Sequence, residues 1–233
     1  MFVKICGVTT VDDALLSAGL GADAIGLNFA DSPRRIDMEI ARQVMDRLPP
    51  DVLAIGVFRN QSRDEVIETA TSLGIEVVQL HGDETPEDCR WVAERMTGLI
   101  RAFGIADPAL TGGADYGPHR LLIDSPQPGS GQVFDWSNLD QVLGGRPFIL
   151  AGGLNPDNVA DAIDVARPWG VDVASGVEAT PGRKDPGKVR RFIAGARQAA
   201  ATIAAAPQAN AGLFGIDETG HDHQHEQTTE TTW

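Results

Sequence analysis

The sequence predicts an α/β protein built as a closed (β/α)8 TIM-type barrel. Two observations support this fold class. Short apolar runs rich in β-branched residues alternate with helix-like segments, which is typical of parallel strands joined by helices. The chain has 233 residues, of which 42% are hydrophobic, and this is enough for one barrel of ordinary size. An open doubly wound sheet is the main alternative.

Eight runs have the continuous apolar character of strands that are buried on both faces. They cover residues 2–6, 24–29, 53–58, 77–80, 99–103, 120–123, 148–151 and 171–174. Helix-like segments lie between most of them, at residues 10–18, 38–47, 63–73, 86–96, 155–166 and 186–204. The connection 106–119 is rich in glycine and proline, so we expect the fifth helix to be short or missing.

The end of the chain differs from the rest in composition. From residue 207 onward it is polar and acidic and contains no Lys or Arg. We therefore expect a catalytic barrel domain over residues 1–204 and a disordered, His-containing tail over 205–233. The alternating His221, His223 and His225 could hold a transition metal weakly, but no Cys or distant His completes a site, and a solvated tail is favoured.

Charge and composition exclude several function classes. The formal net charge of −14 disfavours nucleic acid and anionic membranes as partners. No apolar stretch is long enough to span a bilayer, and the first residues lack the pattern of a signal peptide. With only two cysteines, the chain is not a disulfide scaffold. We expect a cytoplasmic protein that acts on a small molecule, either as a monomer or as a homodimer.

Cys6 is predicted to lie at the carboxyl end of the first strand, where barrel enzymes carry their chemistry. Taken alone, such a cysteine is more often a small buried hydrophobe. Lys4 shares its strand face and neighbours Asp172 of the eighth strand in a closed barrel, which predicts a buried ion pair beneath the site. This pairing favours a structural role for Lys4, with a Schiff-base lysine as the minority alternative.

Polar residues also occur at the ends of the fourth and sixth predicted strands. Gln79 and His81 are two positions apart and therefore share a strand face. For His81, a structural hydrogen bond and a ligand role are equally compatible with this position. Asp124 follows a fully apolar run, where it could donate a proton or merely cap a turn.

Three glycine-containing loops follow the last three predicted strands. Barrels commonly bind phosphate through backbone amides of loops at this end, so we expect a phosphorylated substrate. The expected phosphate-binding residues are Gly129, Ser130 and Gly131, then Gly152 and Gly153, and finally Ser175 and Gly176.

Six motifs run in order along the predicted barrel. They are Lys-Ile-Cys-Gly at 4–7, Ser-Pro-Arg-Arg-Ile at 32–36, Val-Gln-Leu-His-Gly at 78–82, Gly-Ser-Gly-Gln-Val-Phe-Asp-Trp at 129–136, Ala-Gly-Gly-Leu-Asn-Pro at 151–156 and Val-Asp-Val-Ala-Ser-Gly-Val-Glu at 171–178. In these motifs the chain resembles the phosphoribosylanthranilate isomerases of tryptophan biosynthesis. The resemblance implies an Amadori rearrangement of N-(5-phosphoribosyl)anthranilate to 1-(2-carboxyphenylamino)-1-deoxyribulose 5-phosphate, without cofactor or metal.

The resemblance also assigns roles to individual residues. It makes Cys6 the general base, Asp124 the general acid and Arg34 a ligand of the anthranilate carboxylate, which suits a planar two-pronged donor. We expect Gln79, His81 and Asp172 to bind substrate as well. Two positions depart from the family pattern: Gln132 stands where many relatives carry Lys, and Asn28 where the family is usually apolar.

Three competing functions remain to be weighed. The histidine-pathway isomerase performs the same rearrangement on a similar barrel with two carboxylates, whereas this chain has Cys6 in the base position. A metal-dependent sugar-phosphate epimerase needs clustered ligands, and the predicted barrel offers only His81 and His119. A non-catalytic sensor of phosphate ligands would have no need for base, acid and phosphate loops together.

Overall fold

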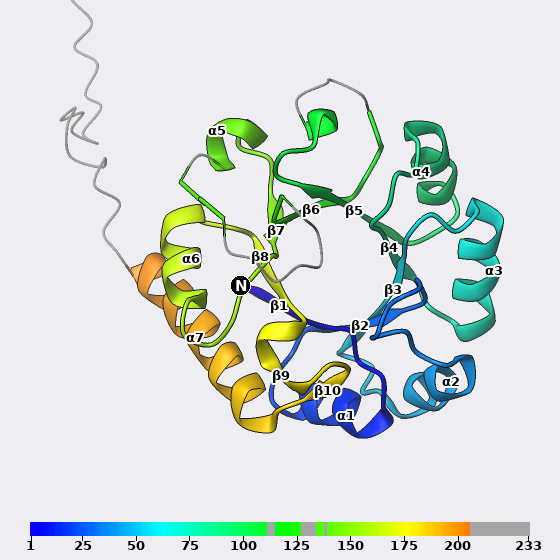
Figure 1. Cartoon of the computed structure of the whole chain (residues 1–233), viewed down its shortest axis with the longest axis horizontal. Helices are drawn as coiled ribbons and strands as arrows, with labels where there is room; N and C mark the ends of the chain where they lie inside the picture. Colours follow the sequence, from blue (N-terminus) through cyan, green and yellow to red (C-terminus); the bar gives the residue numbers. More distant parts are fainter. Residues whose placement is uncertain (111–114, 127–133, 138, 206–233) are drawn as a thin grey trace, which may run out of the picture.

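In this computed structural model, residues 1–110, 115–126, 134–137 and 139–205 are described. Eight parallel strands close into a barrel in the order β1 to β8 (Figure 1). The strands are β1 (Phe2–Cys6), β2 (Ala24–Asn28), β3 (Leu53–Phe58), β4 (Val77–Leu80), β5 (Gly98–Gly104), β6 (Arg120–Asp124), β7 (Phe148–Leu150) and β8 (Gly170–Val173). The predicted barrel is therefore confirmed, and the open doubly wound sheet is wrong, because β1 pairs with β8.

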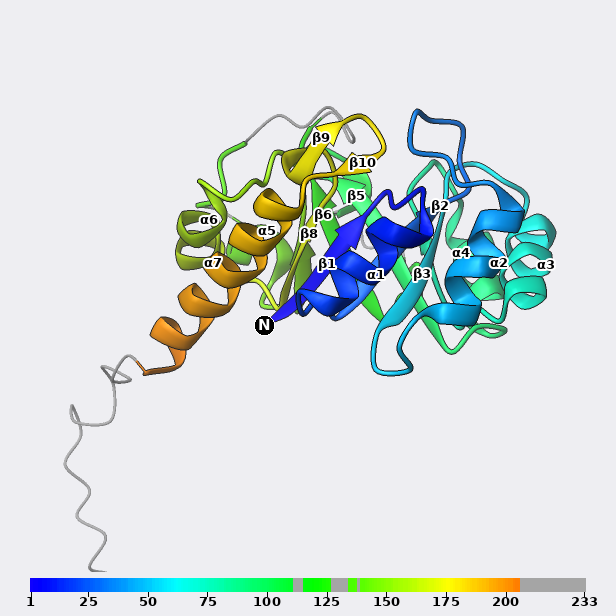
Figure 2. The same cartoon turned by 90° about the horizontal axis from the view of Figure 1, so that it is seen from below.

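Helices surround the strands on the outside of the barrel (Figures 1 and 2). They are α1 (Val11–Gly19), α2 (Met38–Arg47), α3 (Arg63–Leu73), α4 (Pro86–Ala93), α5 (Leu139–Leu143), α6 (Val159–Ala166) and α7 (Pro186–Ala205), with short 3-10 helices η1 (Pro108–Leu110) and η2 (Ser175–Val177). In the described part of the connection between β5 and β6, η1 is the only helical turn, as the glycines and prolines predicted. Residues 206–233, nearly all of the predicted tail, lie outside the described residues.

Local side-chain chemistry sets several helix starts. The Thr10 hydroxyl accepts a hydrogen bond from the Asp13 amide at the start of α1, and Ser62 and Glu65 form a reciprocal capping box at α3. The helix predicted over residues 155–166 begins later in the structure, as α6. Asn155 accepts a hydrogen bond from the Asp157 amide and forms a turn there, so the helix begins only after Asn158.

A small hairpin that periodicity did not predict follows the eighth strand. It consists of β9 (Glu178–Thr180) and β10 (Arg183–Lys184), which pair antiparallel around a turn in which Gly182 has a φ of 79°. Figure 2 shows the hairpin at the end of the barrel opposite the N-terminus of the chain. It therefore lies at the carboxyl ends of the barrel strands.

The alternation of side chains along each strand determines what fills the barrel interior. Apolar residues form the inner core, namely Ala24, Ile55, Ile100, Ala102, Leu122, Ile149 and Ala151. The larger apolar cluster packs between the strands and the helices. Toward the carboxyl ends of the strands, the inward-facing positions become polar. They are occupied there by Gln79, Asp124 and Asp172. The change from apolar to polar side chains places the site at the carboxyl ends. Among the described helices, none has the length and apolar character that crossing a membrane requires.

Candidate active site

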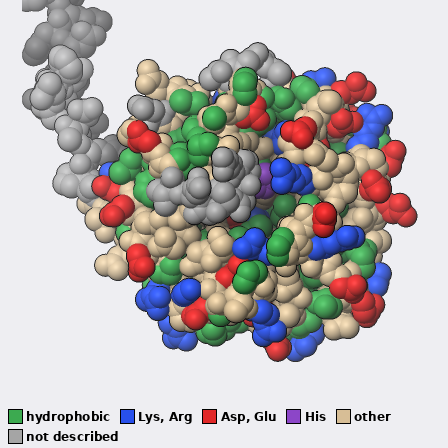
Figure 3. Space-filling model, in the orientation of Figure 1, with side chains coloured by type: hydrophobic (Ala, Val, Ile, Leu, Met, Phe, Trp, Pro, Cys, Tyr) green, Lys and Arg blue, Asp and Glu red, His purple; other side chains and the backbone are tan. Residues whose placement is uncertain are grey.

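A cavity of about 370 Å³ opens at the carboxyl ends of the strands. The predicted site residues that line it are Cys6, Arg34, Gln79, His81, Asp124, Gly152, Gly153, Asp172 and Ser175. Figure 3 views this face, and basic side chains lie beside a histidine near its centre. The fold therefore brings together predicted site residues from six of the eight βα units.

Lys4 and Asp172 form the buried ion pair that the sequence predicted. The two residues are direct partners in the pairing of β1 with β8, and Nζ of Lys4 lies 3.0 Å from Oδ1 of Asp172. Lys4 is fully buried. Burial by itself lowers the pKa of Lys4, but Asp172 and then Cys6 raise it, and the net pKa lies above the ordinary value. The ammonium charge is therefore retained beneath the site.

The thiol of Cys6 lies against this ammonium group. Burial raises the pKa of Cys6, Lys4 and more weakly Lys184 lower it, and the net pKa lies above that of an ordinary thiol. Gly26 of β2 provides the space: a Cβ at this position would lie 2.6 Å from Sγ of Cys6 and 3.1 Å from Nζ of Lys4. A glycine is thus needed where the strand passes the thiol.

Gln79, His81 and Asp124 form a polar chain across the cavity wall. Nε2 of Gln79 lies 3.0 Å from Nδ1 of His81, and Nε2 of His81 lies 3.3 Å from Oδ2 of Asp124. When the Gln79 amide donates to Nδ1, the proton of a neutral His81 is on Nε2, facing the carboxylate. The other carboxylate oxygen of Asp124 accepts a hydrogen bond from the Ser125 amide at 2.7 Å. His81 and Asp124 were predicted separately, and the structure brings them into contact.

Arg34 is held by a carboxylate that sequence reasoning did not single out. Nε and Nη2 of Arg34 lie 2.8 and 2.9 Å from the two carboxylate oxygens of Glu178. Burial raises the pKa of Glu178, but Arg34 and Lys184 together lower it by more than burial raises it. The net pKa therefore lies below the ordinary value. Glu178 is the last residue of the motif at 171–178. Its place in this motif was the one feature of the sequence that could have identified it as a site residue.

Asn28 organises the loop that carries Arg34. Its side chain accepts a hydrogen bond from the Ala30 amide at 2.9 Å and donates one to the Ser32 hydroxyl at 2.9 Å. The same hydroxyl accepts a hydrogen bond from the Arg34 amide at 3.1 Å. The polar residue at position 28 therefore shapes the loop after β2 in the manner of an Asx turn.

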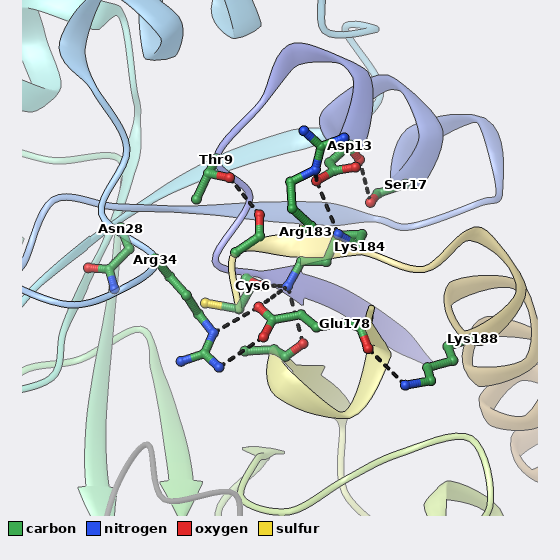
Figure 4. Close-up of polar contacts among 12 residues, drawn as sticks. Cys6, Thr9, Asp13, Ser17, Asn28, Arg34, Glu178, Arg183, Lys184 and Lys188 are labelled. Carbon is green, nitrogen blue, oxygen red and sulfur yellow. Dashed lines mark hydrogen bonds and ion pairs between the residues drawn. The ribbon is translucent and has the colours of Figure 1, made fainter. Parts of the chain in front are cut away.

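Lys184 is a second residue that the sequence reasoning missed. Its ammonium group donates hydrogen bonds to the backbone carbonyls of Cys6 and Ala174, at 2.6 and 3.2 Å, and to Oε1 of Glu178 at 3.1 Å (Figure 4). It was missed because the two strands of the hairpin are too short to show any periodicity. A lysine buried to 5% exposure is unusual and signals a specific role.

The predicted phosphate loops are only partly described. Gly152 and Gly153 have φ values of 81° and 68°, which L side chains rarely adopt, and both line the cavity together with Ser175. A Cβ at Gly176 would collide with the carbonyl of Leu154, so this glycine allows η2 to pack on the loop after β7. Gly129, Ser130, Gly131 and Gln132 lie outside the described residues. Within the described ranges, no cluster of three His, Cys, Asp or Glu side chains could hold a metal ion.

The family model described as N-(5'-phosphoribosyl)anthranilate (PRA) isomerase matches residues 3–195. The chain belongs to this family. An N-(5'-phosphoribosyl)anthranilate isomerase of Citrifermentans bemidjiense is 45% identical over 203 residues, which cover 85% of this chain and 98% of the relative. The resemblance drawn from the motifs is therefore confirmed, and the chain is a member of an isomerase family of tryptophan biosynthesis.

Solved structures of phosphoribosylanthranilate isomerases agree with this membership. The enzyme of Thermotoga maritima superposes with a TM-score of 0.78 at 42% identity, covering 85% of this chain and 99% of that one. A second phosphoribosylanthranilate isomerase, at 41% identity and a TM-score of 0.76 over 85% of this chain and 99% of that one, was solved in complex with reduced 1-(o-carboxyphenylamino)-1-deoxyribulose 5-phosphate.

Proposed function

We propose that this phosphoribosylanthranilate isomerase family member converts N-(5-phosphoribosyl)anthranilate into 1-(2-carboxyphenylamino)-1-deoxyribulose 5-phosphate by general acid and base catalysis. The observation that carries the proposal is that Cys6, Asp124 and Arg34 line the same cavity. Gly152 and Gly153 line it as well. A thiol, a carboxyl group, a guanidinium and bare backbone amides are the groups that this substrate and this reaction require.

The first step opens the ribose ring. Asp124, in its protonated form, gives its proton to the ring oxygen, the bond between this oxygen and C1 breaks, and the anthranilate nitrogen forms a double bond to C1. The position of Asp124 supports this role, because its carboxylate is buried and contacts His81. The product of the step is an open-chain protonated imine.

The second step moves a proton away from C2. The thiolate of Cys6 takes this proton, and the electrons of the C–H bond form a C1–C2 enolamine as the imine nitrogen becomes neutral. The enolamine then tautomerises: C1 gains a proton, the C2 hydroxyl loses one, the C1–C2 double bond becomes single, and a ketone results at C2. The ammonium of Lys4 supports this assignment, because it is the largest influence that offsets the cost of a buried thiolate.

Substrate binding uses the two ends of the ligand. We assign the anthranilate carboxylate to Arg34, whose Nη1 takes part in none of the hydrogen bonds observed among the described residues. The phosphate is assigned to the amides of Gly152, Gly153 and Ser175, with Gly129 to Gly131 and Gly176 completing the predicted set. Gln79 supports a substrate contact because its buried Oε1 lacks a hydrogen-bond partner in the described part of the chain. His81 and Asp172 are proposed to bind the ribose portion.

The experiment that tests the function is a fluorescence assay with purified protein and phosphoribosylanthranilate, without added metal. We expect a loss of substrate fluorescence far above the uncatalysed rate, and we expect Cys6→Ala to abolish it. If the folded protein gives no loss above the uncatalysed rate, the proposed reaction is wrong. Activity with the histidine-pathway substrate alone would instead support that competing isomerase.

A further inference from the structure

The hairpin β9–β10 is fastened to the segment that follows the catalytic strand β1. The Thr9 hydroxyl donates to the Gly182 carbonyl at 2.6 Å, and the Lys184 amide donates to Oδ2 of Asp13 at 3.1 Å (Figure 4). The Arg183 guanidinium lies 3.8 Å from the same carboxylate oxygen. These contacts place the hairpin beside the end of β1, while the position of the Lys184 ammonium group is set by its own three hydrogen bonds.

The ammonium group of Lys184 has no capacity left for a substrate. It carries three N–H donors, and the structure provides three acceptors: the Cys6 carbonyl, the Ala174 carbonyl and Oε1 of Glu178. The side chain is also closed off from solvent. Lys184 therefore acts on the site only through the groups that it binds.

Those groups lead directly to two residues of the proposed mechanism. The Cys6 carbonyl belongs to the residue whose thiol is the proposed base. Glu178 uses both carboxylate oxygens to hold Arg34, the proposed ligand of the anthranilate carboxylate. Arg34 in turn packs its side-chain carbons on Gly7, since a Cβ at Gly7 would lie 2.7 Å from Cδ of Arg34. One buried ammonium thus links the base to the carboxylate ligand.

We propose that Lys184 is a positioning residue that fixes the Cys6 thiol and the Arg34 guanidinium relative to each other, through the Cys6 carbonyl and the Glu178 carboxylate. This inference rests on the proposed function, because it takes Cys6 as the base and Arg34 as the carboxylate ligand. Burial lowers the pKa of Lys184 and thus disfavours its charged form, with Glu178 opposing this shift. Because apolar replacements of buried ion pairs are often neutral or stabilising, stability alone does not account for a charge at this position.

The same ammonium contributes to the electrostatic surroundings of the thiol. The charged groups around Cys6 are Lys4 on β1, Asp172 on β8, Lys184 on β10 and Arg34 on the loop after β2, with Glu178 on β9 between Arg34 and Lys184. Lys184 lowers the pKa of Cys6, so its removal raises that pKa further. Each unit by which this pKa rises reduces the thiolate fraction at neutral pH about tenfold.

The test compares Lys184→Met with Thr9→Val in the full-length protein. Methionine keeps the length of the lysine side chain but removes all three donors, whereas Thr9→Val loosens the hairpin without touching the ammonium group. The readouts are kcat and KM for phosphoribosylanthranilate, and the pH dependence of Cys6 alkylation by iodoacetamide without substrate. Mass spectrometry of the Cys6 peptide separates this reaction from labelling of Cys89.

For Lys184→Met we expect a lower kcat, a higher KM and a fall in kcat/KM of up to about 10²-fold, as for a misplaced reacting group. The alkylation profile of Cys6 shifts to higher pH, while Thr9→Val leaves this profile unchanged. Glu178→Gln is the second variant: it raises KM more than it lowers kcat, because Arg34 loses its charged partner, and it does not slow alkylation of Cys6.

Two results would overturn the proposal. One is an unchanged pH profile of Cys6 alkylation in Lys184→Met. The other is an equal loss of kcat/KM in Lys184→Met and Thr9→Val, because Lys184 would then only attach the hairpin to the barrel. If Lys184→Met does not fold, Lys184→Gln, which also removes the charge, takes its place in the comparison with Thr9→Val. Alkylation of Cys6 needs no isomerase activity, so failure of the proposed function is seen separately, as absent turnover in the unsubstituted protein.

Discussion

Nε2 of His81 lies 3.3 Å from Oδ2 of Asp124, and the other ring nitrogen of His81 faces Gln79 at 3.0 Å. The carboxyl group of the proposed general acid therefore contacts the His81 imidazole through one oxygen and the Ser125 amide through the other.

We predict that His81→Asn lowers kcat by up to about 10²-fold, because Asp124 loses the imidazole that orients its carboxyl group. His119→Asn is the matched control, since His119 accepts a hydrogen bond from the Leu99 amide at the start of β5, away from the cavity. Equal effects of the two substitutions on kcat would contradict the prediction.

Cys6→Ala and Asp124→Asn should each reduce kcat by about 10² to 10⁴, the range of single acid and base groups. Both substitutions are small enough to leave the barrel folded, which circular dichroism and thermal unfolding would check. Near-normal turnover in both variants would exclude the proposed mechanism.

The two thiols should differ in reactivity. Burial raises the pKa of Cys89 to about 11, and the residue is fully buried. The pKa of Cys6 is also raised, but its thiol lines the open cavity. A raised pKa means that little thiolate exists at neutral pH and that alkylation accelerates as pH rises. A labelling time course should therefore show Cys6 reacting first at every pH in the native protein, and earlier labelling of Cys89 would refute this.

Gly26→Ala should impair catalysis more than folding. The added Cβ would lie 2.6 Å from Sγ of Cys6, so the thiol must move from its position beside Lys4. A displacement near 1 Å costs up to about 10²-fold in rate. Gly19→Ala is the control, because nothing lies within 4 Å of a Cβ at that position. We expect kcat to fall only for Gly26→Ala, and a normal kcat in this variant would argue against a fixed thiol position.

Lys4→Met should destabilise the protein by about 3 to 5 kcal/mol, because the Asp172 carboxylate is left buried without its partner. The folded-state pKa of Lys4 lies above its ordinary value of 10.5, so this stabilisation is complete below that pH and is lost only as pH rises through the folded-state pKa. Urea unfolding at neutral pH measures the full effect. Lys4→Met combined with Asp172→Asn should recover part of the stability, and an additive loss would contradict the pairing.

Much of the barrel could be predicted because its signals are local. The apolar runs fixed the bounds of β1, β3 and β4 to the residue, and the closed barrel follows from their number and spacing. Closure then made Lys4 and Asp172 neighbours, which is why their ion pair was predicted from sequence. The hairpin β9–β10 gave no such signal, since strands of two or three residues have no period to detect.

The sequence by itself determined the fold, the family and the residues that carry the proposed chemistry, because motifs and strand periodicity are properties of neighbouring positions. Only the tertiary structure decided how those residues act on one another. Arg34 and Glu178 are 144 positions apart, and Lys184 and Cys6 are 178 positions apart. A hydrogen bond depends on a separation of about 3 Å and on direction, and no local pattern encodes either of these across such a distance along the chain.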